Sequence, residues 1–338
     1  MQKERESNFE LLRIISMFLV LVVHADYFSL GAPSFQDCAS NPVQSIFRIG
    51  VESVSIICVN VFVLISGWFG IRFKWKSICN FLFQVFFFGV LIYLFVVIFL
   101  NVPVSLKGVA ACFQITTWNW FVKSYLCLYI LSPVLNAFCE KADHKTFATV
   151  LLSFFVFQTI YGWTGSAKFI LQGYSAISFC GLYLLAQYTK RFLLPAVCNK
   201  KIVRGGVILY VFCTLSMLAI EFFSKRYSLP MIGMFNYINP LVIVSSLSIL
   251  VVFSQIKLQS KVINWVAASC FAVFLIHTNV NLCVPYYKAF VNYLYANYDG
   301  LLCVGLIWGF IAIVFVCSIL LDQIRKFLWN VINARFPN

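Results

Sequence analysis

The sequence predicts an all-α, polytopic integral membrane protein with about ten transmembrane helices and both termini in the cytoplasm. Hydrophobic residues make up 62% of the chain and charged residues only 11%, against roughly 25% charged residues in ordinary soluble domains. A soluble fold of this length has too little interior to hide so much apolar surface. Because no polar stretch is long enough to fold alone, we expect residues 1–338 to form a single transmembrane domain with no separate soluble domain.

Apolar runs of about 20 residues, the length of a helix that crosses the hydrocarbon core, recur along the whole chain. With the N-terminus inside, 17 of the lysines and arginines between these runs fall on the cytoplasmic side and 6 on the opposite side. The positive-inside rule predicts this asymmetry, and it places both termini in the cytoplasm. The expected spans are residues 9–29, 49–70, 78–100, 119–138, 147–164, 172–189, 203–222, 239–254, 264–283 and 301–321.

The formal net charge of +14 does not indicate a nucleic-acid-binding protein. The basic residues form short clusters between apolar runs instead of one basic face, so membrane topology explains them better. Most of the cysteines lie inside apolar runs, where a thiol acts as a small hydrophobic side chain. Because no Cys-x-x-Cys pair and no His/Cys cluster of zinc spacing is present, we expect no metal site.

Two ionisable residues in the first span need an explanation, because charge is costly inside a bilayer. Arg13 and His24 are eleven positions apart, almost a whole number of helical turns, so they project from one face about 16 Å apart along the axis. Taken alone, Arg13 is as readily explained by snorkelling to the interface beside Glu10, and His24 by a structural hydrogen bond. Together they favour a cation for a phosphorylated donor and an imidazole that acts as a general base on a hydroxyl.

Three further polar residues lie within or beside expected spans. Lys123 either snorkels to the outer interface or contacts a phosphate or an acidic sugar. Glu52 is either interfacial, or a partner of Lys123, or a group that orients His24. His277, in the ninth span, is expected to bond to a neighbouring helix, and as a pocket residue it would help to bind an acceptor.

The pattern Asn8-x-Glu10-Leu-Leu-Arg13 with His24 eleven positions after the arginine resembles the membrane-bound acyltransferase-3 family, which includes bacterial O-antigen and capsule O-acetyltransferases. Further resemblances follow in order over nearly the whole chain. They are residues 61–68 (Val-Phe-Val-Leu-Ile-Ser-Gly-Trp), 120–125 (Trp-Phe-Val-Lys-Ser-Tyr) with 128–133, and, more loosely, 173–175 with 181–183 and 263–264 with 275–277.

This resemblance implies a ten-helix core, an acyl-CoA donor, with acetyl-CoA expected, and a hydroxyl of a surface glycan or of its lipid-linked precursor as acceptor. Position by position, it makes His24 the catalytic histidine and Arg13 the donor-binding arginine. It further implies a bacterial cytoplasmic membrane and no tightly bound cofactor. The sequence departs from the family pattern at Asn60, where many members have proline. The candidate pocket residues are Glu52, Asn60, Ser66, Trp120, Lys123, Tyr125 and His277.

The proposed chemistry leaves two points open. The oxyanion that forms in acyl transfer needs a hydrogen-bond donor, for which Tyr125, Asn60 and Lys123 are candidates, and transfer is either direct or through an acyl-histidine. Ser66 lacks the Gly-x-Ser-x-Gly elbow of a nucleophile. The alternative function is a membrane transporter or glycan flippase, which should show paired broken helices. We find no convincing pair of Gly/Pro interruptions in the sequence.

Overall fold

The structure is a computed structural model that describes residues 5–115, 117, 119–165, 167–194, 199–229 and 233–335, and within these ranges every regular element is helical. The first half contains α1 (Ser7–Val23), η1 (His24–Phe28), α2 (Phe35–Ser40), α3 (Pro42–Ser55), α4 (Cys58–Phe69), α5 (Trp75–Phe99), α6 (Leu106–Cys112), α7 (Trp120–Lys141), α8 (His144–Phe157) and η2 (Gln158–Thr164). The second half contains η3 (Leu171–Gly173), α9 (Ala176–Tyr188), η4 (Thr189–Leu193), α10 (Lys200–Arg226), α11 (Pro240–Ser254), α12 (Lys261–Ala267), α13 (Cys270–His277), η5 (Cys283–Lys288), α14 (Ala289–Asn297) and α15 (Gly300–Arg335).

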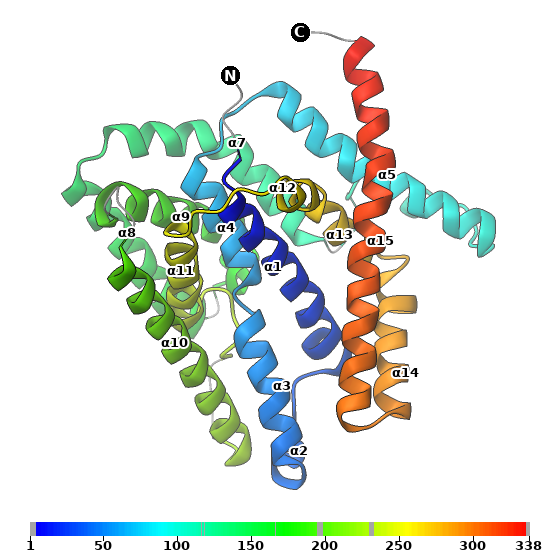
Figure 1. Cartoon of the computed structure of the whole chain (residues 1–338), viewed down its shortest axis with the longest axis horizontal. Helices are drawn as coiled ribbons and strands as arrows, with labels where there is room; N and C mark the ends of the chain where they lie inside the picture. Colours follow the sequence, from blue (N-terminus) through cyan, green and yellow to red (C-terminus); the bar gives the residue numbers. More distant parts are fainter. Residues whose placement is uncertain are drawn as a thin grey trace.

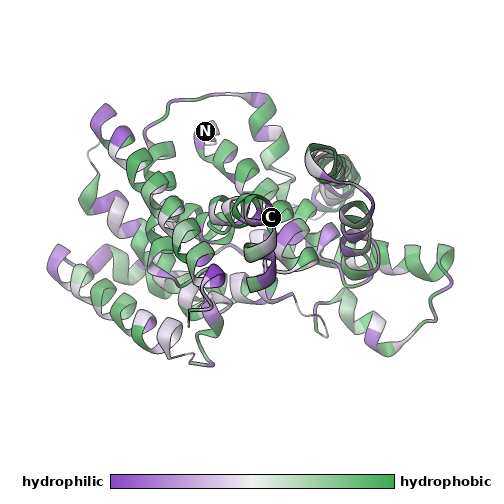
Figure 2. Cartoon of the chain, turned by 90° about the horizontal axis from the view of Figure 1, so that it is seen from below, coloured by the Kyte–Doolittle hydropathy of each residue, from purple (hydrophilic) through white to green (hydrophobic). Residues whose placement is uncertain are grey.

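The chain is a multi-pass membrane protein. Apolar residues run along most of the helices, and the polar residues gather near helix ends and connections (Figure 2). Among the described residues, 7 helical segments are long and apolar enough to cross a membrane. They are Ser7–Phe28, Pro42–Phe69, Trp75–Phe99, Trp120–Lys141, His144–Thr164, Lys200–Arg226 and Gly300–Ala334. The other three expected spans coincide with the shorter helices α9, α11 and α12–α13, so a count of ten crossings stays a prediction.

Helix α1 lies in the middle of the bundle and organises the packing around it (Figure 1). It packs against α3, α4, α11, α12, α13 and α15. Its residues Phe9, Leu12 and Leu21 are buried in the main hydrophobic core. The start of α1 and the last turns of α15 lie at the same end of the molecule, and α2 and α14 lie at the other (Figure 1). Residues 20–23, directly before η1, are buried, so neighbouring helices enclose this end of α1.

Close contact between α4 and α9 depends on one glycine. A Cβ atom built on Gly67 would lie 2.6 Å from the backbone oxygen of Tyr183 and 2.8 Å from its Cα. Only a residue without a side chain permits this approach. The preceding Ser66 hydroxyl bonds within its own helix, to the carbonyl of Phe62 at 3.0 Å. Gly67 of the Ser-Gly segment thus serves packing in this fold.

Two expected spans are interrupted rather than continuous. The second breaks at residues 56–57 into α3 and α4, and the ninth breaks at residues 268–269 into α12 and α13. Neither break contains glycine or proline, so no breaker in the sequence marks them. The ninth helix also ends at His277, six residues before the expected boundary at 283.

The last helix is longer than expected. The expected span ends at residue 321, but α15 has 36 residues and continues to Arg335. Asp322 is buried there, and Arg325 donates to both of its carboxylate oxygens, at 2.7 and 3.0 Å. Charge neutralisation within the pair permits a charged residue at this buried position of the helix. Neither Gly nor Pro occurs between residues 310 and 336, so no residue in this stretch breaks the helix.

Candidate active site

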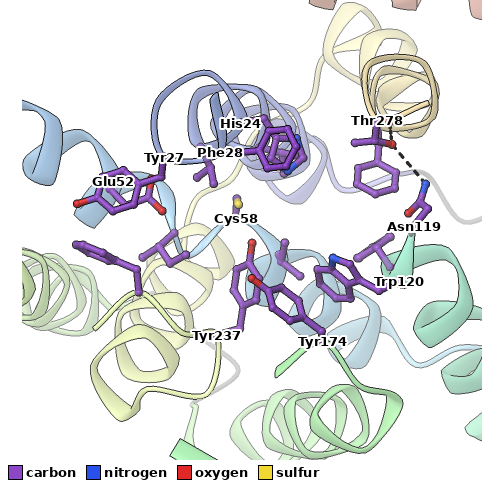
Figure 3. A pocket seen from close by; sticks show the side chains of 17 residues that line it. His24, Tyr27, Phe28, Glu52, Cys58, Asn119, Trp120, Tyr174, Tyr237 and Thr278 are labelled. Carbon is purple, nitrogen blue, oxygen red and sulfur yellow. Dashed lines mark hydrogen bonds between the residues drawn. The ribbon is translucent and has the colours of Figure 1, made fainter. Parts of the chain in front are cut away.

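A cavity of about 290 Å³ lies where η1, the break between α3 and α4, and the C-terminal end of α13 meet (Figure 3). Its walls come from α1 and η1, the end of α3 and the start of α4, the start of α7, α13 and the loops before α9 and α11. Most of the lining side chains are apolar or aromatic, and a few polar groups point inward. The labelled residues of this kind are His24, Tyr27, Glu52, Cys58, Asn119, Trp120, Tyr174, Tyr237 and Thr278. A small apolar pocket with a few converging polar groups is the usual form of a ligand site.

His24 forms a direct pair with a second histidine. Its Nδ1 lies 2.8 Å from Nε2 of His277, and Nδ1 of His277 lies 2.6 Å from the carbonyl oxygen of Val273. A carbonyl oxygen only accepts hydrogen bonds, so in the neutral pair His277 carries its proton on Nδ1. His277 Nε2 must then accept from Nδ1–H of His24. This arrangement leaves Nε2 of His24 without a proton, as a base beside the cavity.

Local structure places both histidines. His24 is the first residue of the π-helical turn η1, and its carbonyl accepts a hydrogen bond from the Ser29 hydroxyl at 2.6 Å. Such turns widen a helix locally and are frequent at functional sites. His277 is the last residue of α13, and its ring packs near Tyr287, whose hydroxyl donates to the Leu21 carbonyl at 2.7 Å. The two rings are thus held from both sides.

Of the candidate pocket residues, Glu52 and Trp120 line the cavity. Glu52 lies in the last turn of α3 with 2% of its surface exposed, and its Oε2 has no hydrogen-bond partner among the described residues. Trp120 begins α7 and contacts the rings of Tyr174 and Tyr237. Glu52 does not contact His24 through a hydrogen bond; the group that orients His24 is His277.

Arg13 does not line this cavity. Its guanidinium donates to Glu10 at 2.6 Å, and 30% of its side chain is exposed. Arg5 approaches the same carboxylate at 3.8 Å. The structure therefore contains the Glu10 partnership that the sequence offered as the plainer explanation of Arg13, about 16 Å along the helix from His24.

The candidates for stabilising the oxyanion point elsewhere. Lys123 is exposed, and its ammonium donates at 2.9 Å to the carbonyl of Thr117. Tyr125 and Ser66 share a hydrogen bond of 3.0 Å outside the cavity. Asn60 donates to the carbonyl of Tyr237, at 2.8 Å. Of the three, Asn60 hydrogen-bonds to a cavity residue, and Tyr125 stacks on another, Phe121, but none of the three lines the cavity itself.

Several cavity residues were not singled out from the sequence, because they come from separate loops and helix ends. Asn119 precedes α7, and its amide lies 3.4 Å from the hydroxyl of Thr278, which follows His277. Cys58 is the first residue of α4, so the N-terminal end of that helix faces the cavity. The partial positive charge of a helix N-terminus favours negative charge nearby. Among the described residues, no group of three or more His, Cys, Asp and Glu is placed to hold a metal ion.

Comparison with known proteins identifies one relationship. The family model Acyl_transf_3, described as an acyltransferase domain, matches residues 6–322. That range includes every residue of the cavity. No curated protein and no solved structure matches the chain.

Proposed function

This chain belongs to the acyltransferase family whose model it matches, and we propose that it transfers an acyl group, acetyl in the first instance, from acyl-CoA to a glycan hydroxyl. The acceptor is a surface polysaccharide such as O-antigen, capsule or exopolysaccharide, or its lipid-linked precursor. The membrane is the bacterial cytoplasmic membrane, and no tightly bound cofactor takes part. The observation that carries the proposal is the histidine pair, because it keeps the outer nitrogen of His24 unprotonated beside a cavity.

The proposed reaction begins when the acceptor hydroxyl donates a hydrogen bond to Nε2 of His24. As the hydroxyl oxygen attacks the thioester carbonyl, its proton moves to His24. The imidazolium that forms is stabilised by its Nδ1–H bond to His277. The tetrahedral intermediate then expels the CoA thiolate, which takes the proton from His24 and leaves as the free thiol. The N-terminal end of α4, at Cys58, is a source of stabilisation for the oxyanion.

In the proposed topology the chain crosses the membrane ten times, with both termini in the cytoplasm. The positive-inside asymmetry supports this, and so does the position of the start of α1 and the end of α15 at one end of the molecule (Figure 1). Arg13 then lies at the cytoplasmic mouth, where it contacts the phosphates of CoA. The separation of about 16 Å from His24 is spanned by the extended arm that carries the acyl group.

The direct test is transfer of labelled acetyl from acetyl-CoA to cell-surface polysaccharide, in membranes that contain the wild-type chain or His24→Ala at equal expression. We expect label with the wild type and a loss of about 10²-fold or more without the base. His144→Ala is the matched control, because His144 bonds to Tyr188 at the surface and is remote from the cavity. Absence of wild-type transfer with every plausible donor and acceptor would contradict the proposal.

A transporter or flippase is the second candidate, and one observation favours it. One interrupted helix, α3–α4, borders the cavity at its break, as interrupted helices do at transport sites. The two functions separate on acyl-CoA consumption: the enzyme releases free CoA in proportion to the glycan modified, and a transporter releases none.

A further inference from the structure

The cavity contains a buried hydrogen-bond acceptor with nothing to accept from. Glu52 has 2% of its surface exposed, and its Oε2 has no hydrogen-bond partner among the described residues. Arg48, one turn earlier on α3, is engaged elsewhere: it pairs with Asp26 at 2.5 Å and donates to the carbonyl of Gly31. An unsatisfied buried carboxylate is costly. A ligand that brings hydrogen-bond donors to Glu52 would remove that cost.

Another wall of the same cavity is aromatic. The ring of Trp120 lies 4.5 Å from that of Tyr174 and 5.9 Å from that of Tyr237, and the two tyrosines lie 5.4 Å apart, measured between ring centroids. The three rings come from α7 and from the loops before α9 and α11, and they gather on one side of the cavity (Figure 3). Flat rings with polar tips offer an apolar surface and hydroxyl groups to a ligand that is itself apolar on one face and polar at its edge. A sugar ring has this character.

Size and charge narrow the ligand further. A volume of about 290 Å³ lies at the low end of the range of about 300–1,000 Å³ for ligand pockets, so the cavity suits a single sugar ring. None of the described residues that line it is lysine or arginine, and Glu52 is its only carboxylate. The carboxylate of an acidic sugar would therefore be buried with no lysine or arginine in the cavity lining to pair with it, and an unpaired buried charge is costly.

We propose that Glu52 selects the acceptor: it accepts a hydrogen bond from a donor group beside the hydroxyl that is acylated, so the site takes a non-acidic sugar and rejects a uronic acid. This inference rests on the proposed function for the identity of the acceptor hydroxyl. The recognition itself needs neither donor nor catalysis. Glu52 is thus a specificity residue, distinct from the base His24.

Binding tests the proposal without any acyl transfer. Methyl hexopyranosides and the matching methyl hexuronides are titrated against the full chain in lipid nanodiscs, with saturation-transfer NMR as the readout. We expect at least one neutral glycoside to bind the wild type, and its uronide to bind about tenfold more weakly or not at all. In Glu52→Gln, which keeps the size of the side chain, we expect the affinity for the neutral glycoside to fall about tenfold. The difference in affinity between the neutral glycoside and the uronide should then disappear.

The control variant is Glu140→Gln, which removes an exposed carboxylate on α7 that does not line the cavity and should leave both affinities unchanged. Three results would overturn the inference: equal binding of uronide and neutral glycoside to the wild type, unchanged discrimination in Glu52→Gln, or no binding of any neutral glycoside. Failure of acetyl transfer alone, with this binding pattern intact, would count against the proposed function and leave the role of Glu52 standing.

Discussion

Replacement of His277 tests whether the histidine pair sets the protonation state of the base. His277→Met and His277→Gln both remove the imidazole and the bond to the Val273 carbonyl. Glutamine retains an oxygen able to accept from Nδ1–H of His24, and methionine retains only a thioether, a weak acceptor. The two variants are similar in length. They therefore differ mainly in the hydrogen bond that spans 2.8 Å in the wild type.

The expected magnitude follows from the charge that develops on His24. A hydrogen bond to a charged group contributes about 1.5–3 kcal/mol, and about 1.4 kcal/mol of barrier is a factor of ten in rate. We therefore expect kcat of His277→Met to fall about 10- to 150-fold, with little change in KM for acyl-CoA, because the proposed donor contact is at Arg13. His277→Gln should recover most of the rate.

The assay is initial-rate acetyl transfer in membranes with matched expression, at saturating donor. A methionine variant within twofold to threefold of the wild type would refute the reasoning. So would a glutamine variant as slow as the methionine variant, because the retained acceptor would then have no effect. An effect confined to KM would point to acceptor binding by His277 instead.

Three more predictions follow. Arg13→Gln should raise KM for acyl-CoA about tenfold or more, with Arg13→Lys between it and the wild type, in initial-rate kinetics; an unchanged KM would remove Arg13 from the donor site. Gly67→Ala should lower stability by about 1–3 kcal/mol, read as a lower thermal unfolding midpoint in detergent, because its Cβ would lie 2.6 Å from the α9 backbone. Gly205→Ala has open space and should leave the midpoint equal or higher. Asp26→Asn should lower the free energy of unfolding by about 3–5 kcal/mol, because it leaves the buried Arg48 without its charge partner. Adding Arg48→Met to this variant should recover part of the loss in equilibrium unfolding. If the double variant instead lost the sum of the two single losses, the pairing would be contradicted.

The sequence was sufficient for the helical class, because hydrocarbon permits few other ways to satisfy the backbone. It also pointed to His24, since an ionisable side chain in an apolar run needs a reason. It did not show the partner of His24. His277 lies 253 residues away, and only the packing of α13 against α1 brings the two rings together. The energetic cost of an ionisable side chain in an apolar segment marks His24 in the sequence, but only the tertiary structure shows that its partner is His277.

Arg13 shows the opposite case, in which local spacing already contained the structural answer. Glu10 lies three positions earlier, the separation at which helical side chains meet, and the ion pair is present. The interruptions after α3 and α12 could not be anticipated in the same way, because residues 56–57 and 268–269 are ordinary residues with no helix-breaking signal. The aromatic wall was equally hidden, because Trp120, Tyr174 and Tyr237 are distant in the chain.

The π-helical turn η1 has a consequence for comparing this chain with its relatives. A π-turn is equivalent to an α-helix that has gained one residue. A relative whose first helix remains regular would therefore align with a one-residue gap directly after the histidine. If that gap were placed elsewhere, Asp26 and Tyr27 would be matched to positions rotated by about 100° around the helix. Any inference from relatives about Asp26 and Tyr27 therefore depends on the correct placement of this one-residue gap in the alignment.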